Sequence, residues 1–282
     1  SCVGAEPLAV TDNLNFPSPE TPIGYWQLAM ACRGIATACG ALATPVTGGN
    51  VSLYNETRLP DGRMQPIHPT PVVGMVGLVH DLERVTGLAW RQPGDAVWLL
   101  GVPLESGAAE PDDRLGLGGS SYLAVLHELV TGRPPRVDLE LERSLQSLLR
   151  QAIAEGLISA AHDFSDGGLA VAAAECCIAS GLGARLELPA SSLRPDRLLF
   201  AEGGARVLVA VAPERQQAFS DRLAASGAAP FAQRLGAVSA EAVLRVEQAG
   251  TTLLAEPVAA LAESFEGGLP RRLQQAPPPP ER

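Results

Sequence analysis

The stretch GALATPVTGGNVSLYNE, residues 40–56, decides the fold assignment, because it joins the end of a predicted helix to a short strand and a glycine pair. Pro45 to Asn50 is predicted to be extended and to end at Gly48-Gly49. Paired glycines let successive backbone N–H groups point into one concavity, an anion-binding nest, and let a phosphate approach the main chain. Taken alone, the segment also fits a plain Gly-Gly turn between two strands.

The side chains beside the glycine pair suit phosphate and metal chemistry. Asn50 offers a neutral oxygen that a hard cation accepts, and Ser52 offers a hydroxyl to a phosphate or substrate oxygen. Asp12 ends a predicted buried strand, Glu6 to Asp12, and opens a polar run. Open α/β sheets place ligands at such strand ends, so Asp12 is a candidate ligand for magnesium or a ribose hydroxyl. Capping of the following turn is the alternative.

A second acidic and glycine-rich segment is HDFSDGG, residues 162–168, which follows a predicted strand and precedes an apolar helix. Asp163 and Asp166 can share a metal shell, and His162 can act as a base. The alternative is that Ser165 or Asp166 caps the helix and that His162 is merely buried.

A third glycine-rich segment surrounds Gly118 and Gly119, which precede a helix whose start can accept an anion. Capping of that helix by Ser120 is the alternative.

The composition limits the chemistry of the chain. All 21 basic residues are arginine, so any phosphate must be held by backbone amides, arginine or a metal ion, and a lysine-dependent phosphate site is excluded within this chain. The net charge of -10 argues against a nucleic-acid partner. Five cysteines without a CxxC pair favour a reducing cytoplasm over a disulfide framework. We expect no membrane span.

The alternation of apolar helices and strands predicts an α/β or α+β layered fold. The Pro93-Gly94 turn places a domain boundary near residue 92, which gives domains at 1–92 and 93–265. The segment 266–282 contains four consecutive prolines and is predicted to be a disordered tail. The chain begins at Ser1 just ahead of a predicted strand, so we expect its start to be cut from a longer protein.

The expected helices and strands follow from caps, turns and apolar patterns. Helices are expected at 22–42, 120–130, 139–155, 168–180, 213–225 and 258–263. Strands are expected at 6–12, 45–50, 71–79, 96–101, 158–162, 184–188, 206–211, 231–238 and 242–246.

Taken together, the segments resemble the large synthetase subunit of the phosphoribosylformylglycinamidine synthase family. The matching stretches include AVTDNLNF at 9–16, residues 40–56, and 69–79, 117–123 and 161–170. The resemblance implies the second of two tandem aminoimidazole ribonucleotide synthetase-like units, each with a barrel-forming N-terminal αβ domain and a layered C-terminal α/β domain. This chain would be the C-terminal half, cut in just before its first strand.

The implied activity is that of a ligase of purine biosynthesis. ATP would activate an amide oxygen of formylglycinamide ribonucleotide as a phosphate ester, and ammonia would displace the phosphate to give the amidine. The implied cofactor is Mg²⁺, and the implied partners are a glutaminase subunit that supplies the ammonia and a small accessory subunit. By motif match Asp12 and Gly49 would contact ATP, Asn50 would ligate magnesium and Ser52 would touch the substrate.

Departures from the family pattern concern a possible second nucleotide site formed by Asp163, Asp166, Gly118 and Gly119. Ser121 stands where a glutamate is expected, and EGGAR at 202–206 replaces a Glu-Ser-x-Ser-Arg run, so this site is expected to be vestigial.

No histidine of the chain matches the family's catalytic histidine, which the resemblance places in the missing N-terminal half, so the fragment alone should be inactive. Two alternatives stay open: another ATP-using synthetase of the same superfamily, and a non-catalytic half that carries an auxiliary nucleotide site.

Overall fold

The computed structural model describes residues 1–104 and 113–275. The chain divides into two compact units. Unit 1 comprises Ser1 and Ala5–Leu82, and unit 2 comprises Cys2–Gly4 and the residues from Glu83 onward. The division falls before the boundary predicted near residue 92, because residues 83–92 pack into unit 2. The Trp90 ring, for example, is buried there and donates its indole N–H to Cys177 Sγ at 3.4 Å.

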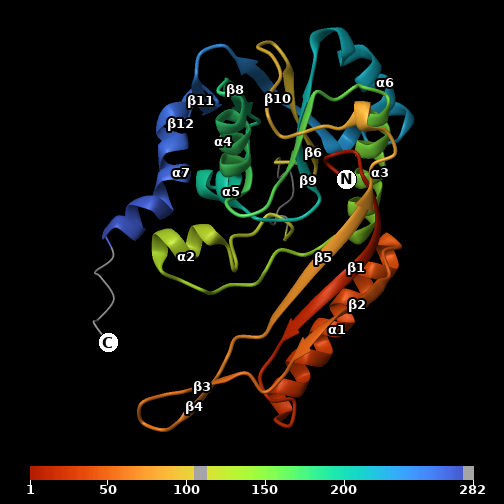
Figure 1. The fold of residues 1–282 in the computed structure, drawn as a ribbon. Helices are drawn as coiled ribbons and strands as arrows, with labels where there is room; N and C mark the ends of the chain where they lie inside the picture. Colours follow the sequence, from red (N-terminus) through yellow and green to blue (C-terminus); the bar gives the residue numbers. More distant parts are fainter. Residues whose placement is uncertain (105–112, 276–282) are drawn as a thin grey trace. The chain divides into compact units, whose positions relative to one another are not determined.

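Unit 1 is a three-stranded sheet in the order β2-β1-β5, accompanied by one long helix (Figure 1). Strand β1 is parallel to β2 and antiparallel to β5. The elements of this unit are β1 (Glu6–Asn15), α1 (Pro22–Leu42), β2 (Val46–Ser52), the hairpin strands β3 (Glu56–Arg58) and β4 (Met64–Pro66), and β5 (Thr70–Leu78).

Helix α1 begins and ends where the sequence predicts. Thr21 is the N-cap, its hydroxyl accepts the Gly24 N–H at 3.1 Å, and Pro22 occupies the first helical turn. Ala43 ends the helix in a left-handed conformation with φ 55°.

Unit 2 is a seven-stranded mixed sheet in the order β12-β11-β8-β10-β6-β9-β7. Strand β6 is a continuous apolar run and β9 is apolar after Arg206, as expected for strands covered on both faces. The strands are β6 (Ala96–Gly101), β7 (Ala160–Asp163), β8 (Gly183–Leu188), β9 (Arg206–Val211), β10 (Ala232–Ser239), β11 (Val243–Gln248) and β12 (Thr251–Pro257).

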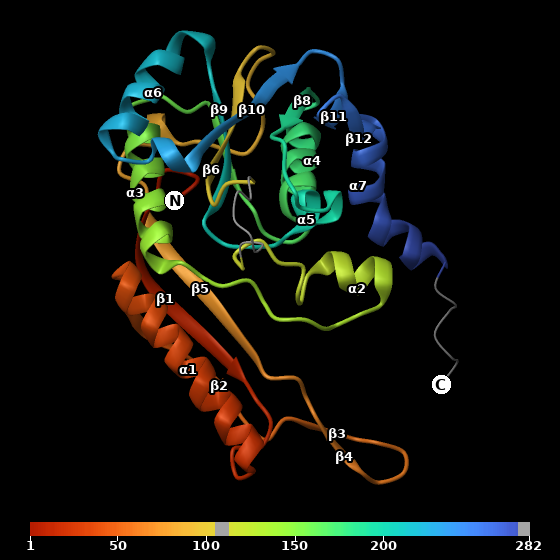
Figure 2. The same ribbon diagram turned by 180° about the vertical axis from the view of Figure 1, so that it is seen from behind.

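Helices cover both faces of this sheet, which makes unit 2 a layered α/β domain (Figure 2). Helices α3 and α6 lie on one face, and α4 with α5 and α7 lies on the other (Figures 1 and 2). The helices are α2 (Ser121–His127), α3 (Leu139–Ala154), α4 (Gly168–Ser180), α5 (Pro195–Phe200), α6 (Gln216–Ala225) and α7 (Val258–Gln275), with 3₁₀ turns η1 (Leu82–Arg84), η2 (Pro213–Arg215) and η3 (Ala229–Phe231).

Several predicted boundaries differ from the structure, among them the ends of two helices. Helix α7 continues to Gln275, whereas we expected it to end at Glu263 and a disordered tail to start at residue 266. Pro270 lies inside α7, and good helix formers flank it, with Leu and Glu before it and Arg and Leu after it. The prolines at 277–280 lie outside the described residues. Helix α2 ends at His127, because Glu128 adopts a left-handed conformation with φ 54°.

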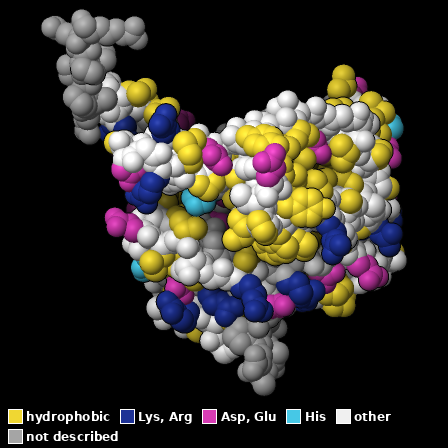
Figure 3. All heavy atoms as spheres, turned by 90° about the horizontal axis from the view of Figure 1, so that it is seen from below, with side chains coloured by type: hydrophobic (Ala, Val, Ile, Leu, Met, Phe, Trp, Pro, Cys, Tyr) yellow, Lys and Arg dark blue, Asp and Glu magenta, His cyan; other side chains and the backbone are white. Residues whose placement is uncertain are grey.

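Unit 1 exposes much apolar surface. All nine residues of β5 are exposed, and so are Ile23, Tyr25 and Trp26 on α1. Hydrophobic side chains also gather over one broad area of the face shown in Figure 3. Contiguous exposed apolar surface usually marks a region that is covered in an assembly.

Among the described residues, none of the helices combines the length and the apolar character that a membrane span needs.

Candidate functional site

The glycine pair of residues 48 and 49 lies beside Asp12, in the middle of the unit 1 sheet. Strands β1 and β2 run in parallel with Asp12 opposite Gly49 and Asn13 opposite Asn50. Asp12 is therefore inside β1 and not at its end, which corrects our prediction. The reason is that residues 12–15 pair with β2 on one side and with β5 on the other, so the ladder continues through the polar run.

Gly49 is required by the close approach of Asp12. A Cβ at position 49 would stand 2.1 Å from Asp12 Oδ1 and 2.3 Å from the Asp12 main-chain oxygen, whereas a Cβ at Gly48 would meet nothing within 4 Å. Both glycines belong to β2, and neither takes a left-handed conformation. The anion nest predicted for this pair is therefore not formed by its backbone.

Asn50 meets two other asparagines on its own face of the sheet. Its Nδ2 donates to Asn13 Oδ1 at 3.4 Å, and Asn15 Nδ2 donates to the same oxygen at 3.2 Å. Because side chains alternate along a strand, Asp12 and Gly49 point to the opposite face. The structure thus brings Asn50 together with Asn13, and Asp12 together with Gly49.

A shallow hollow of about 430 Å³ lies at this point of unit 1. Its volume is within the range of small-molecule sites. Within the described chain, no hydrogen bond or ion pair engages the Asp12 carboxylate or the Asn50 amide oxygen. The residues that line it are Thr11, Asp12, Asn13, Gly49, Asn50, Val72 and Gly74.

Ser52 lies two residues further along β2, on the face of Asn50. Its hydroxyl is within 3.1 Å of the Asn55 side chain, and Asn55 Nδ2 donates to the Ser52 main-chain oxygen at 2.8 Å. Asn55 was not singled out from the sequence, although an asparagine that fixes a turn after a strand is a common local signal. Asn55 thus orients the Ser52 hydroxyl, which lies on the same face of the sheet as Asn13 and Asn50.

The donor set fits a magnesium ion in part. The Asn50 amide oxygen is the kind of neutral ligand that Mg²⁺ accepts, but Mg²⁺ prefers near-octahedral oxygen coordination and usually takes its remaining ligands from phosphates, carboxylates and water. No group of three or more His, Cys, Asp or Glu side chains in the described residues is arranged to hold a metal. Asn50 would therefore supply one ligand to the ion, and the other ligands would come from outside this group of residues.

In unit 2, His162 is held by a carboxylate from helix α4. Its Nε2 lies 2.7 Å from Glu175 Oε2, and its Nδ1 lies 3.8 Å from Asp163 Oδ1. Sequence reasoning missed Glu175, yet it is the one charged residue in the apolar helix α4, and such a residue signals a partner. His162 is thus part-buried and engaged, as expected for a structural histidine.

The two acidic residues of the HDFSDGG segment lie on its exposed side. Asp163 and Asp166 are exposed, and the helix α4 that follows is capped by Gly167 without any side-chain cap. The alternative that Ser165 or Asp166 caps this helix is therefore wrong, because Gly167 is its N-cap. The Gly167 N–H donates to Glu202 Oε1 at 2.7 Å.

At the other glycine pair, Ser120 caps helix α2, as one of our two interpretations predicted. Its Oγ accepts the Leu123 N–H at 3.3 Å. The next amide, that of Ser121, donates to Glu202 Oε1 at 2.8 Å. Gly118 packs so closely that a Cβ there would stand 2.1 Å from the Arg133 main-chain oxygen.

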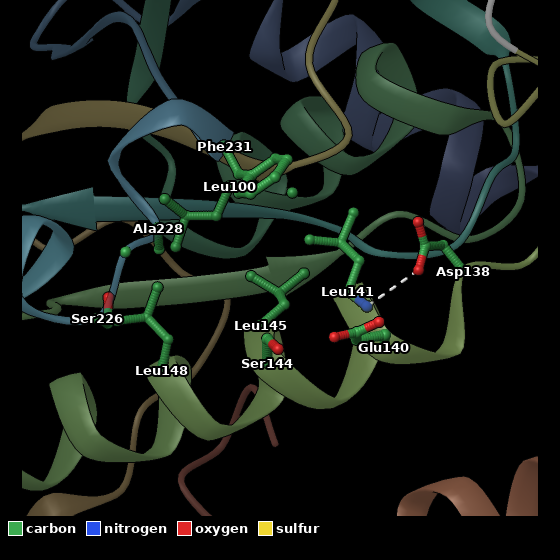
Figure 4. A pocket seen from close by; sticks show the side chains of 12 residues that line it. Leu100, Asp138, Glu140, Leu141, Ser144, Leu145, Leu148, Ser226, Ala228 and Phe231 are labelled. Carbon is green, nitrogen blue, oxygen red and sulfur yellow. Dashed lines mark hydrogen bonds between the residues drawn. The ribbon is translucent and has the colours of Figure 1, made fainter.

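A separate cavity of about 330 Å³ lies in unit 2 between α3, β6 and the turn after α6 (Figure 4). Leucines of α3 and the Phe231 ring form its walls, and Asp138 lies at one end, where it accepts the Leu141 N–H at 3.1 Å (Figure 4). The described residues that line this cavity include no arginine.

The buried cysteines are not nucleophiles. Burial raises the pKa of the Cys177 thiol to about 11 and raises that of Cys176 still further. Burial also raises the pKa of Cys2 to about 11, with a smaller contribution from the charge of Asp163. These thiols stay protonated at neutral pH.

Comparison with known families identifies the class of both units. Residues 92–248 match the AIR synthase related protein, C-terminal domain, and residues 1–79 match the AIR synthase related protein, N-terminal domain. The chain therefore belongs to the AIR synthase related family. This confirms the predicted fold class of an N-terminal αβ domain followed by a layered α/β domain.

Within this family the chain is similar to subunit PurL of phosphoribosylformylglycinamidine synthase. It is 63% identical over 277 residues to phosphoribosylformylglycinamidine synthase subunit PurL of Prochlorococcus marinus (strain MIT 9303), which covers 97% of this chain and 35% of the relative. It is 54% identical over 275 residues to PurL of Synechococcus elongatus, with coverages of 97% and 35%. The chain thus spans about a third of the length of these curated relatives.

Solved structures share the fold at low identity. Thermotoga maritima PurL complexed with ATP superposes with a TM-score of 0.64 at 20% identity, over 93% of this chain and 38% of that chain. The same protein complexed with FGAR gives a TM-score of 0.65 at 20% identity, over 93% and 40%. The hydrogenase maturation protein HypE gives 0.61 at 17% identity, over 91% and 78%.

Proposed function

We propose that the chain is the C-terminal part of a phosphoribosylformylglycinamidine synthase, a carbon-nitrogen ligase of de novo purine biosynthesis. The whole enzyme would convert formylglycinamide ribonucleotide, ammonia derived from glutamine, and ATP into formylglycinamidine ribonucleotide, ADP and phosphate. The observation that carries the proposal is the 63% identity to PurL over 97% of the chain. Identity at this level over both domains supports a shared role.

The role of this chain in the reaction would be to bind and orient ATP, Mg²⁺ and the substrate. The γ-phosphoryl group of ATP would pass to the amide oxygen of the substrate, and ammonia would then form the new C–N bond as phosphate leaves. Asp12 and Gly49 would contact ATP, Asn50 would supply one ligand to Mg²⁺, and Ser52 would touch the substrate. When bound, Mg²⁺ neutralises phosphate charge, which matters in a chain without lysine.

Polar atoms of unit 1 that make no hydrogen bond within the described residues support this assignment. Asp12 and Asn50 both contribute to the lining of the hollow, although their side chains lie on opposite faces of the sheet. Neither the Asp12 carboxylate nor the Asn50 amide oxygen is used by a hydrogen bond in the described residues. The Ser52 hydroxyl is already oriented by Asn55. Acid-base chemistry would come from outside this chain, since none of the described histidines borders this hollow.

The exposed apolar surface of unit 1 supports a second element of the proposal. We propose that β5 and α1 are covered when the three-stranded sheet completes a β-barrel with another unit of the same kind. The partners of the whole enzyme would be a glutaminase subunit and a small accessory subunit, and the setting would be the cytoplasm.

Reconstitution tests the proposed function. The chain is joined to the N-terminal part of its 63% identical relative and is assayed with the glutaminase and accessory subunits, glutamine, ATP and formylglycinamide ribonucleotide. We expect ADP formation that depends on substrate, and a raised KM for formylglycinamide ribonucleotide in Ser52→Ala, with Thr47→Ala, on the same strand, as the control. Absence of substrate-dependent ADP formation, when the relative's own full-length protein is active in the same assay, would contradict the proposal.

A further inference from the structure

The glycine-rich loops of unit 2 already hold a carboxylate from their own chain. Glu202 Oε1 accepts the Ser121 N–H at 2.8 Å and the Gly167 N–H at 2.7 Å. These two amides belong to segments that are far apart in sequence, the loops before α2 and before α4. A single oxygen therefore satisfies the donors that a phosphate oxygen would otherwise use.

The turn that carries Glu202 is closed on its other side by a second carboxylate. Glu142 of α3 accepts the Ala205 N–H, and a Cβ at Gly204 would stand 2.6 Å from Glu142 Oε1. An entering phosphate would therefore meet two negative charges in addition to losing free donors. The negative charge of these carboxylates would repel a phosphate.

A buried arginine in the same turn fixes this arrangement. The Arg206 side chain is only 2% exposed, it donates to the main-chain oxygens of Ala201 and Gly203, and its guanidinium lies 4.7 Å from the centre of the Phe164 ring. These contacts hold the turn of residues 201–206 in place.

Both glycine pairs have a packing reason that involves no ligand. A Cβ at Gly168 would stand 2.5 Å from the Ala201 main-chain oxygen, and a Cβ at Gly118 would stand 2.1 Å from that of Arg133. Gly167 has φ +79° and Gly168 has φ +63°, conformations that side chains rarely adopt. The glycines are needed to bring chain segments together.

We propose that Glu202 is the internal ligand of these two loops and that it closes unit 2 to phosphate-bearing ligands. Any phosphate must displace a carboxylate that is tethered to the site and therefore present at high effective concentration. Gly118, Gly119, Asp163 and Asp166 then serve the architecture of unit 2, and the nucleotide chemistry of the chain is confined to unit 1.

Amide NMR and hydrogen exchange test this on the purified chain, with Mg·ADP and inorganic phosphate as probes. In the wild type neither probe should shift the Ser121 or Gly167 amide. In Glu202→Ala, both amides should exchange at least about tenfold faster, and phosphate should now shift them. Glu202→Gln keeps an acceptor oxygen and should retain most of the protection. Glu214→Ala removes an exposed carboxylate elsewhere in unit 2 and is the control, with no expected effect.

Two results would overturn the assignment. One is a saturable shift of the Gly118, Gly119, Ser121 or Gly167 amide when Mg·ADP is added to the wild type. The other is unchanged exchange at Ser121 and Gly167 in a folded Glu202→Ala variant. Neither readout requires turnover, so the result is independent of the reaction proposed for unit 1.

Discussion

The Asp12 carboxylate lies against Gly49 so closely that a Cβ at position 49 would stand 2.1 Å from its Oδ1. The two residues are register partners on the parallel strands β1 and β2. This contact ties the shape of the polar hollow to the absence of a side chain at one position, and it separates the roles of the two neighbouring glycines.

Gly49→Ala should destabilise unit 1, because the added methyl group collides with both the side chain and the main chain of Asp12. Overpacking of this kind costs about 1–3 kcal/mol in free energy of unfolding. Gly48→Ala is the matched control, since its Cβ meets nothing within 4 Å and alanine is favoured over glycine in a strand by roughly 0.5–1 kcal/mol. Urea unfolding measures both. Equal losses in the two variants would show that the Asp12 contact does not set the requirement.

The cap of helix α1 gives a second prediction. The Thr21 hydroxyl accepts the Gly24 N–H at 3.1 Å, so Thr21→Ala should lower the free energy of unfolding by about 1 kcal/mol. Thr21→Ser keeps the acceptor and should cost much less. The comparison is made by urea denaturation followed by circular dichroism at 222 nm. If serine and alanine are equally destabilising, the hydroxyl is not acting as the cap.

The buried thiol of Cys177 predicts a loss of stability at alkaline pH. Burial raises its pKa from 9.0 to about 11, which the Trp90 N–H partly offsets. Between these pH values the unfolded chain loses the proton first, so the native state binds more protons and the free energy of unfolding falls as pH rises. The contribution is present below pH 9 and falls by up to about 1.4 kcal/mol per pH unit, so that roughly 2 kcal/mol is lost by pH 11 and the rest above it.

Urea unfolding of Cys177→Ala at several pH values from 8 to 11 checks this prediction. The variant should lose stability less steeply than the wild type over this range. Cys32→Ala, which removes an exposed thiol, should follow the wild-type slope. A Cys177→Ala slope identical to that of the wild type would mean that this thiol does not resist ionisation.

Elements with strong local signals could be predicted from the sequence. Helix α1 has a threonine cap followed by proline, α3 has an Asp138 cap and an apolar stripe at helical spacing, and β6 is a continuous apolar run. Strand β12 was missed, because its hairpin turn uses Ala249 with φ 48° before Gly250 with φ 77°, and alanine does not signal that conformation. The polar end of β1 was missed because pairing on both sides overrode its low strand propensity.

The candidate site was predictable only in part, for a similar reason. The sequence marked Asp12, Gly49, Asn50 and Ser52 as a group, but strand alternation divides them between two faces, which requires knowledge of the register. The role of Glu202 was not predictable at all. It depends on hydrogen bonds to residues 81 and 35 positions away, which only the folded sheet brings together.

The measurement that tests the central claim most directly is calorimetry of Mg·ATP binding. It is made with the chain joined to the N-terminal part of its 63% identical relative, as wild type, Asp12→Ala and Asn50→Ala. We predict that the wild type binds and that each variant loses at least about tenfold in affinity, which is the worth of one charge-assisted hydrogen bond or metal ligand. Equal binding by all three proteins would contradict a nucleotide and magnesium site at this point of unit 1.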